Sequence, residues 1–155
     1  MVGQVENELE VNVPSAVLWD IYKGLELGRI GSRLLPGIFE RVEVVEGDGS
    51  VGTILKIVFP KGSLVPYHKE KFTVIDNEKR LKVAEVIEGG FLNLGFSFYH
   101  VYLQIIEKDE KSSIIKSTIK FEVEPGSEAD SSLITIKAMQ LVAEAIGKYL
   151  TDEKI

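Results

Sequence analysis

Cysteine is absent from the 155 residues of the sequence, and histidine occurs only twice, as His68 and His100. Without cysteine the chain can form no disulfide, no thiolate metal site and no cysteine nucleophile. Two histidines are too few for a typical zinc triad unless carboxylates complete the ligand set. We therefore predict no resident metal, and the lack of disulfides favours a cytosolic location.

A basic surface and long apolar runs are also missing. The 18 lysines and arginines stand against 24 aspartates and glutamates, which gives a formal net charge of -6. A general nucleic-acid binder needs a basic face instead. No apolar run approaches the roughly 20 residues that span a bilayer, and Met1–Glu6 has neither the basic nor the apolar region of a signal peptide. We expect neither a nucleic acid nor a membrane as partner.

The composition that remains is typical of one globular domain. Hydrophobic residues make up 45% of the chain and charged residues 27%, as in ordinary soluble proteins. The length is sufficient for a sizeable single core, and no repeat, low-complexity tract or linker divides the sequence. We predict a single domain over residues 1–155, present as a monomer or weak dimer.

The spacing of apolar residues predicts an α+β fold. Alternation and turn signals predict seven strands, near residues 4–13, 38–46, 53–59, 68–75, 80–88, 96–107 and 113–123. Short helices are expected at 14–24 and 26–35. Apolar residues at three-to-four-residue spacing predict a long helix over 129–150. Short loops between strands favour an antiparallel sheet, which can curve around the long helix and leave a cavity between the two.

A glycine-rich segment, Gly47–Thr53, has the look of a phosphate-binding loop. It lacks the Gly-Lys-Ser/Thr ending that supplies a lysine and a magnesium-binding hydroxyl. It also joins two predicted strands, so no helix N-terminus follows to receive a phosphate. A plain hairpin loop is favoured over nucleotide binding.

Glu70 is the strongest functional signal from patterning. Alternation in its predicted strand puts the lysines on one face and, on the other, His68, Glu70, Phe72 and Val74. A carboxylate on such a semi-apolar wall can act as a general base. The alternative is a structural ion pair, with Lys82 or Arg80 as partner.

Two neighbouring segments are ambiguous. The apolar face of the next strand is Leu81, Val83 and Ile87, so periodicity alone places Lys82 outside. The segment Phe96–Leu103 is aromatic on both faces, which indicates either a ligand wall or dense packing against the helix, with packing the default.

Short runs across nearly the whole chain carry a family resemblance. They are Glu8–Val11, Leu34–Gly37, Gly47–Leu55, Lys69–Phe72, Asp76–Glu78 with Arg80–Lys82, Ile87–Gly90 with Leu92 and Leu94–Gly95, and Ile115–Ser117. Together they resemble the Bet v 1-like proteins of pathogenesis-related class 10, and within them the norcoclaurine synthase branch. The resemblance implies a helix-grip fold: a curved seven-stranded antiparallel sheet around a long C-terminal helix, with two short helices and a large internal cavity.

The resemblance also implies a chemistry. Norcoclaurine synthases condense dopamine with 4-hydroxyphenylacetaldehyde in a Pictet–Spengler reaction, without metal or cofactor. By analogy Lys82 would handle protons in the carbonyl and iminium steps and contact the catechol, and Glu70 would take the ring proton that restores aromaticity. This places Lys82 in the cavity despite its periodicity, on the expectation that alternation breaks at a bulge. Ligand contacts are expected from Leu55, Phe72, Phe98, His100, Val101, Met139 and Leu141.

Two positions depart from the family pattern. His68 stands where the family has a tyrosine, and we include it among the catalytic residues because an imidazole can replace a phenol as hydrogen-bond partner. Val101 stands where the family has an aspartate, and it can neither accept a proton nor pair with an amine. His100 adjoins the lost aspartate, although strand alternation points it to the other face.

Three functions follow from these residues, in order of preference. The first is a small-molecule binder for benzylisoquinoline alkaloids or their precursors, with weak or no condensation activity. The second is an active norcoclaurine synthase in which His68 compensates for the missing groups. The third is a generic carrier of hydrophobic plant metabolites, because fold alone does not decide function.

Overall fold

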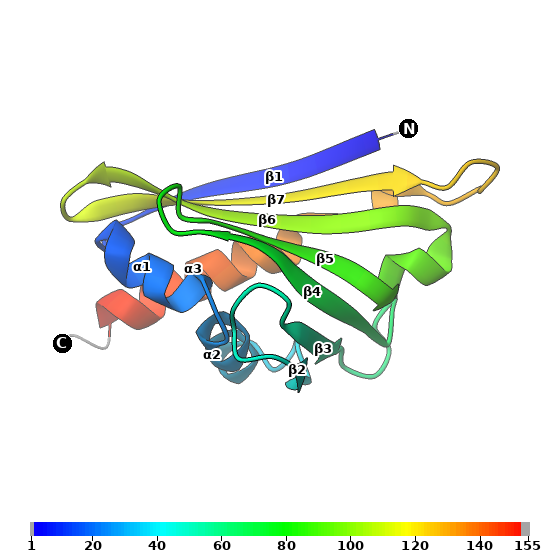
Figure 1. Cartoon of the computed structure of the whole chain (residues 1–155), viewed down its shortest axis with the longest axis horizontal. Helices are drawn as coiled ribbons and strands as arrows, with labels where there is room; N and C mark the ends of the chain where they lie inside the picture. Colours follow the sequence, from blue (N-terminus) through cyan, green and yellow to red (C-terminus); the bar gives the residue numbers. More distant parts are fainter. Residues whose placement is uncertain (1, 153–155) are drawn as a thin grey trace.

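In the computed structural model, which describes residues 2–152, a curved antiparallel sheet wraps around a long helix (Figure 1). The strands are β1 (Val2–Val11), β2 (Arg41–Glu46), β3 (Ile54–Val58), β4 (Tyr67–Asp76), β5 (Leu81–Gly89), β6 (Phe96–Asp109) and β7 (Ser112–Val123). They are hydrogen-bonded in the order β1-β7-β6-β5-β4-β3-β2. The helices are α1 (Ser15–Tyr22), α2 (Glu26–Leu34) and α3 (Lys137–Asp152), with 3-10 turns η1 (Gly90–Leu94) and η2 (Ser131–Leu133).

This arrangement confirms the predicted fold class. The α+β architecture, the seven-stranded antiparallel sheet, the two short helices and the long C-terminal helix are all present. The single domain predicted for 1–155 also includes Met1 and residues 153–155, which lie outside the described residues. None of the helices described within residues 2–152 is long and apolar enough to cross a membrane.

The strands at one side of the sheet follow the predicted alternation. Along β1 exposed and half-buried residues alternate without a break, and Val5 and Leu9 of its inner face pack against the main core. Helix α3 comes close to this strand at Gly147, where an added Cβ would lie 2.9 Å from Val11 Cγ1. A glycine at this position therefore allows the helix to approach the sheet.

Helix α3 begins at Lys137, eight positions later than the predicted start at 129. The chain before it forms η2 and an extended segment. Asp130 accepts a hydrogen bond from Ser132 N at 2.9 Å, and such side-chain bonds to the local backbone compete with helix formation. Ile134, which was assigned to the helical stripe, is buried outside the helix. Ile134 therefore fits the apolar spacing of the helix although it belongs to the segment before it, and this is why the predicted start was too early.

Two irregularities interrupt the pairing of β4 with β5. Lys69 pairs with Glu88 and Glu70 with Val86, so Ile87 has no partner; farther along, Thr73 is the extra residue between the pairs of Phe72 and Val74. A bulge of this kind reverses the faces that follow it. Val74, predicted to face inward, is 40% exposed.

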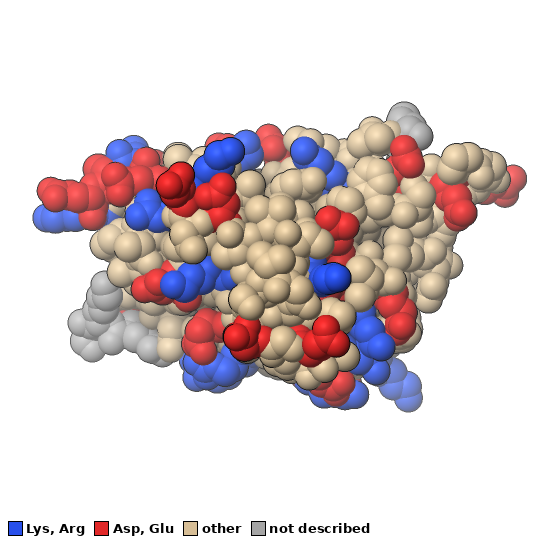
Figure 2. Space-filling view, in the orientation of Figure 1, with Lys and Arg blue, Asp and Glu red and all other residues tan. Residues whose placement is uncertain are grey.

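The loop Gly47–Thr53 connects β2 to β3, as the hairpin interpretation predicts. Gly47, Gly49 and Gly52 all have positive φ, which explains the glycine content. Thr53 closes the loop because its Oγ1 accepts a hydrogen bond from Gly49 N at 2.8 Å. Acidic and basic side chains are interspersed over the face of the molecule seen in Figure 2.

Candidate functional site

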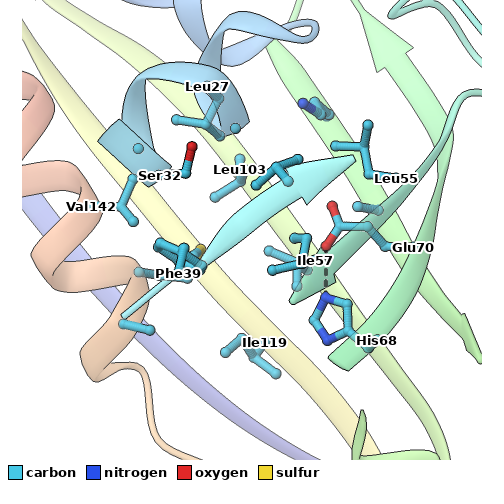
Figure 3. Close-up of a pocket in the computed structure, with 18 of the residues that line it drawn as sticks. Leu27, Ser32, Phe39, Leu55, Ile57, His68, Glu70, Leu103, Ile119 and Val142 are labelled. Atoms are coloured by element: carbon cyan, nitrogen blue, oxygen red, sulfur yellow. Dashed lines mark hydrogen bonds and ion pairs between the residues drawn. The ribbon is translucent and has the colours of Figure 1, made fainter. Parts of the chain in front are cut away.

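A cavity of about 130 Å³ lies between the concave face of the sheet and helices α2 and α3 (Figure 3). Strands β2 to β7 contribute residues to its floor and wall, and α2 and α3 cover it. Its lining is mainly apolar and includes Leu27, Phe39, Leu55, Ile57, Leu103, Ile119 and Val142. Four side chains with titratable groups also line it: His68, Glu70, Lys82 and Tyr99. An apolar pocket with a few convergent polar groups is the usual form of a small-molecule site.

Strand β4 supplies a hydrogen-bonded pair, His68 and Glu70. The two residues are two positions apart on one face, and His68 Nε2 lies 3.0 Å from Glu70 Oε1 (Figure 3). Their side chains are only 11% and 14% exposed. When Nε2 carries the proton, the imidazole donates to the carboxylate and its Nδ1 is left for another partner. The sequence analysis offered Lys82 or Arg80 as the ion-pair partner of Glu70. In the structure the partner of Glu70 is His68.

The His68 ring is held by its surroundings. The ring of Phe59 meets it in an edge-to-face arrangement, with centroids 5.3 Å apart. On another side the backbone of Gly90 approaches so closely that an added Cβ would lie 2.9 Å from His68 Cβ, and Gly90 has a φ of +57°. The imidazole therefore keeps one orientation toward Glu70.

Lys82 lies inside the molecule, only 3% exposed. Its Nζ donates to the backbone oxygens of Tyr22 at 3.0 Å and Gly24 at 3.1 Å, and it stands 3.9 Å from the centroid of the Phe72 ring. Burial lowers the pKa of the Lys82 ammonium to about 8, while the negative charge of Glu70 opposes the shift. The lysine is thus a wall residue of the cavity tied to the C-terminal end of α1.

The periodicity argument for Lys82 was wrong, and the expected bulge is not the reason. Lys82, Ala84 and Val86 are all buried and alternate regularly along β5. The irregularity comes only afterwards, at Ile87, which is 46% exposed. A lysine can occupy the inner face because carbonyl oxygens at the end of a helix accept hydrogen bonds from its ammonium group.

Tyr99 is a wall residue that patterning did not single out. Its ring stacks on Phe91 of η1 with centroids 5.3 Å apart and planes within 1°, and its centroid lies 6.5 Å from that of His68. Burial, together with the charge of Glu70, raises the pKa of the Tyr99 phenol above its usual range. The available signal was the segment with aromatics on both faces. Its inner side serves both suggested purposes, since Phe96 is core and Tyr99 lines the cavity.

The predicted ligand-contact residues divide into two groups. Leu55, Val101 and Met139 line the cavity. Four others do not line it: Phe72, Phe98, His100 and Leu141. Phe72 is fully buried behind Lys82 in a small cluster with Leu55 and Ala84. On α3, the cavity is faced by Ala138, Met139 and Val142 instead of Leu141.

Phe98 and His100 lie together on the outer side of β6. Their rings are 4.7 Å apart, and His100 Nε2 is 3.4 Å from Glu85 Oε1. Alternation explains the placement, because Tyr99 and Val101 occupy the inner side of the same strand.

Val101 sits in the wall between Ala84 of β5 and Ile119 of β7. The side chain of Val101 carries no charge, and Glu70 is the only carboxylate among the described residues that line the cavity. Across residues 2–152, no group of three histidine or acidic side chains is placed to hold a metal ion. The site accordingly offers acid–base chemistry from His68, Glu70 and Lys82 in an apolar enclosure.

Comparison with known proteins agrees with this architecture. The chain is 43% identical to norbelladine synthase of Narcissus pseudonarcissus, over 99% of this chain and 95% of the relative. It is 38% identical to S-norcoclaurine synthase 2 of Papaver somniferum, over 98% of this chain and 67% of the relative. Among solved structures, a norcoclaurine synthase point mutant of Thalictrum flavum with a transition-state analogue superposes with a TM-score of 0.90 at 36% identity, covering 100% of this chain and 98% of that one.

The family itself is shown by a direct match. Residues 1–153 match the model of the pathogenesis-related protein Bet v 1 family. The resemblance drawn from short sequence runs is thereby confirmed, including its link to the norcoclaurine synthases. The chain is a member of the Bet v 1 family.

Proposed function

We propose that the cavity binds an aromatic amine and an aromatic aldehyde, precursors of benzylisoquinoline-type alkaloids, and promotes their condensation as far as the imine, while ring closure is weak or absent. The observation that carries this proposal is the make-up of the wall: His68, Glu70 and Lys82 meet in one apolar cavity, whereas Val101 replaces the acid. The names of the relatives support it. So does the structure of a Thalictrum flavum norcoclaurine synthase in complex with dopamine and hydroxybenzaldehyde. That structure superposes with a TM-score of 0.87 at 36% identity, over 98% of this chain and 88% of the other.

Imine formation needs the proton transfers that His68 and Glu70 can provide. The amine nitrogen adds to the carbonyl carbon and gives up one proton to Glu70, while the carbonyl oxygen takes a proton from the His68 imidazolium. Glu70 then passes the proton it received to the resulting hydroxyl, the C–O bond breaks and water leaves. Nitrogen and carbon form a double bond, and the nitrogen returns its remaining proton to His68, which restores both side chains. Such positioned transfers contribute about 10²–10⁴-fold to a rate, and the apolar lining strengthens them by excluding water.

Ring closure makes a further demand. The catechol carbon must attack the iminium while a positioned charge holds the amine end, and Val101 offers none. Glu70 could take the ring proton, as it takes the amine proton in imine formation, so the missing charge at Val101 is what limits ring closure. We therefore place cyclisation well below imine formation in this protein.

The test uses dopamine and 4-hydroxyphenylacetaldehyde with the intact protein. The imine is trapped by borohydride reduction and norcoclaurine is resolved by chiral chromatography. We expect imine formation above the buffer rate, reduced about 100-fold or more in Glu70→Gln, with racemic norcoclaurine at the buffer rate. Glu85→Gln is the matched control, because Glu85 contacts His100 outside the cavity. Val101→Asp is expected to gain stereoselective cyclisation.

Other results would favour other functions. Stereoselective norcoclaurine that disappears in Lys82→Ala and Glu70→Gln would establish a full synthase, which the His68–Glu70 hydrogen bond makes the second candidate. If neither substrate binds, the remaining function is that of a carrier of other hydrophobic metabolites. The mainly apolar lining of the cavity is consistent with that function.

A further inference from the structure

A phenol lies beside the His68–Glu70 pair, and the chemistry above assigns it nothing. Tyr99 comes from β6 and lines the cavity across from β4. Its ring centroid is 6.5 Å from that of His68, with an angle of 48° between the planes. The charge of Glu70 also acts on its hydroxyl. The three residues therefore border the same part of the cavity.

The Tyr99 hydroxyl is free to bind a ligand. Within residues 2–152 no hydrogen bond joins it to another described group. The hydroxyl of Tyr22 also has no partner, but it is completely buried in the core. The Tyr99 hydroxyl is not completely buried. A polar group left at a cavity wall in this way is satisfied at little cost by a ligand oxygen.

The ring that carries this hydroxyl is fixed in place. It stacks flat on Phe91 at 5.3 Å, and Phe91 in turn meets Phe96 edge to face at 5.6 Å. Phe96 is 2% exposed and belongs to the core. A donor that is positioned before the reaction costs no reorganisation during it.

The protonation state of Tyr99 suits a donor. Burial, followed by the negative charge of Glu70, raises the pKa of the phenol above its usual range. At neutral pH the hydroxyl therefore keeps its proton and can donate it in a hydrogen bond, but cannot act as a base.

We propose that Tyr99 is a further catalytic residue, whose hydroxyl donates a hydrogen bond to the carbonyl oxygen of the bound aldehyde. This inference rests on the proposed function. The bond polarises the carbonyl as the amine nitrogen adds to its carbon. It then holds the same oxygen, which His68 has protonated to a hydroxyl, while Glu70 supplies the second proton, the C–O bond breaks and water leaves. Tyr99 neither gains nor loses a proton, so the balance of the condensation is unchanged.

Tyr99→Phe isolates the hydroxyl, because the phenyl ring can still stack on Phe91. We expect the turnover number for imine formation to fall about 100-fold, the typical effect of losing one preorganised donor, with little change in KM. Tyr102→Phe is the matched control, since Tyr102 lies on the outer face of the same strand with Lys120 over its ring at 4.6 Å. Thermal unfolding followed by the fluorescence of Trp19 checks that each variant folds.

A second readout does not depend on turnover. Benzaldehyde labelled with carbon-13 at the carbonyl is bound without amine, and its carbonyl stretch is measured by infrared difference spectroscopy. We expect a lower frequency in the wild type and in Tyr102→Phe than in Tyr99→Phe. Equal frequencies and equal turnover in Tyr99→Phe and the wild type would overturn this inference alone. Lack of benzaldehyde binding to the wild type would overturn the proposed function as well.

Discussion

At the scale of single residues, Lys82 shows how a charged group is accommodated on an inner face. Its ammonium is almost completely removed from water, which is costly for an isolated charge. Two backbone oxygens at the end of α1, those of Tyr22 and Gly24, accept its hydrogen bonds. The residue that the family resemblance assigns to proton handling therefore also connects α1 to the sheet.

Lys82→Met gives a prediction for the pH dependence of stability. The pKa of Lys82 is lowered from 10.5 to about 8 in the native state. Between these values the unfolded chain binds more protons than the native one, so raising the pH stabilises the native state. From near pH 7 to about pH 10, the free energy of unfolding of the wild type is expected to rise relative to Lys82→Met by roughly 2 to 3 kcal/mol. Urea unfolding at a series of pH values measures this difference.

Lys71→Met is the control for that experiment. Lys71 is an exposed lysine on the outer face of β4, so its removal should leave the pH dependence of unfolding unchanged. A parallel course of the wild-type and Lys82→Met curves would contradict the assignment of a lowered pKa to Lys82.

At the scale of elements, two glycines of α2 have different roles: one leaves space in the cavity, and the other allows the helix to pack closely against the sheet. Gly31 lines the cavity, and an added Cβ there would find no atom within 4 Å. An added Cβ on Gly28 would lie 3.1 Å from Val42 Cγ1. The same helix therefore has one glycine that faces open space and one that allows close packing against β2.

Substitutions in α2 should separate these two roles. Gly31→Ala is expected to raise the free energy of unfolding by roughly 0.5 to 1 kcal/mol, the usual gain from replacing a glycine within a helix. Gly28→Ala should gain less or lose stability, because Val42 must move. Chemical unfolding of both variants measures the difference, and a larger gain at Gly28 would contradict the packing described for this helix.

At the scale of the whole molecule, the cavity exists because the sheet curves around α3 without filling the space between them. The two bulges in the β4–β5 pairing accompany this curvature. A ligand that binds only the folded state must stabilise the whole domain by mass action. Binding can therefore be measured as stability, without any assumption about the reaction.

Dopamine at about 100 times its dissociation constant should stabilise the wild type by about 2.7 kcal/mol. For a domain of this size the melting temperature would rise by roughly 5 to 10 °C. Gly31→Leu should fold but lose this shift, because its side chain occupies the space that Gly31 leaves open. Melting followed by Trp19 fluorescence is the measurement, and an equal shift in Gly31→Leu would place dopamine outside the cavity.

Local patterning alone could predict much of the fold, because alternation and helical spacing report which face of an element is buried. The strand β1 and the inner face of β7, with Ile115, Ile119 and Phe121, were predicted in this way. The start of α3 was not, since Asp130 and its neighbours bond to their own backbone and the stripe itself does not reveal where the helix begins. The bulge at Thr73 was also missed, and Val74 with it.

The sequence by itself determined the α+β class, the family resemblance and the pairing of His68 and Glu70 on one face of a strand, because these depend on residues close together in the chain. Only the tertiary structure decided how Lys82 is held on the inner face, that Tyr99 joins the wall, and that Phe98 and His100 do not. These outcomes depend on contacts between distant segments: the carbonyl oxygens of α1 that receive Lys82, and the ring of Phe91 that supports Tyr99. A local hydrophobic pattern contains no information about such partners.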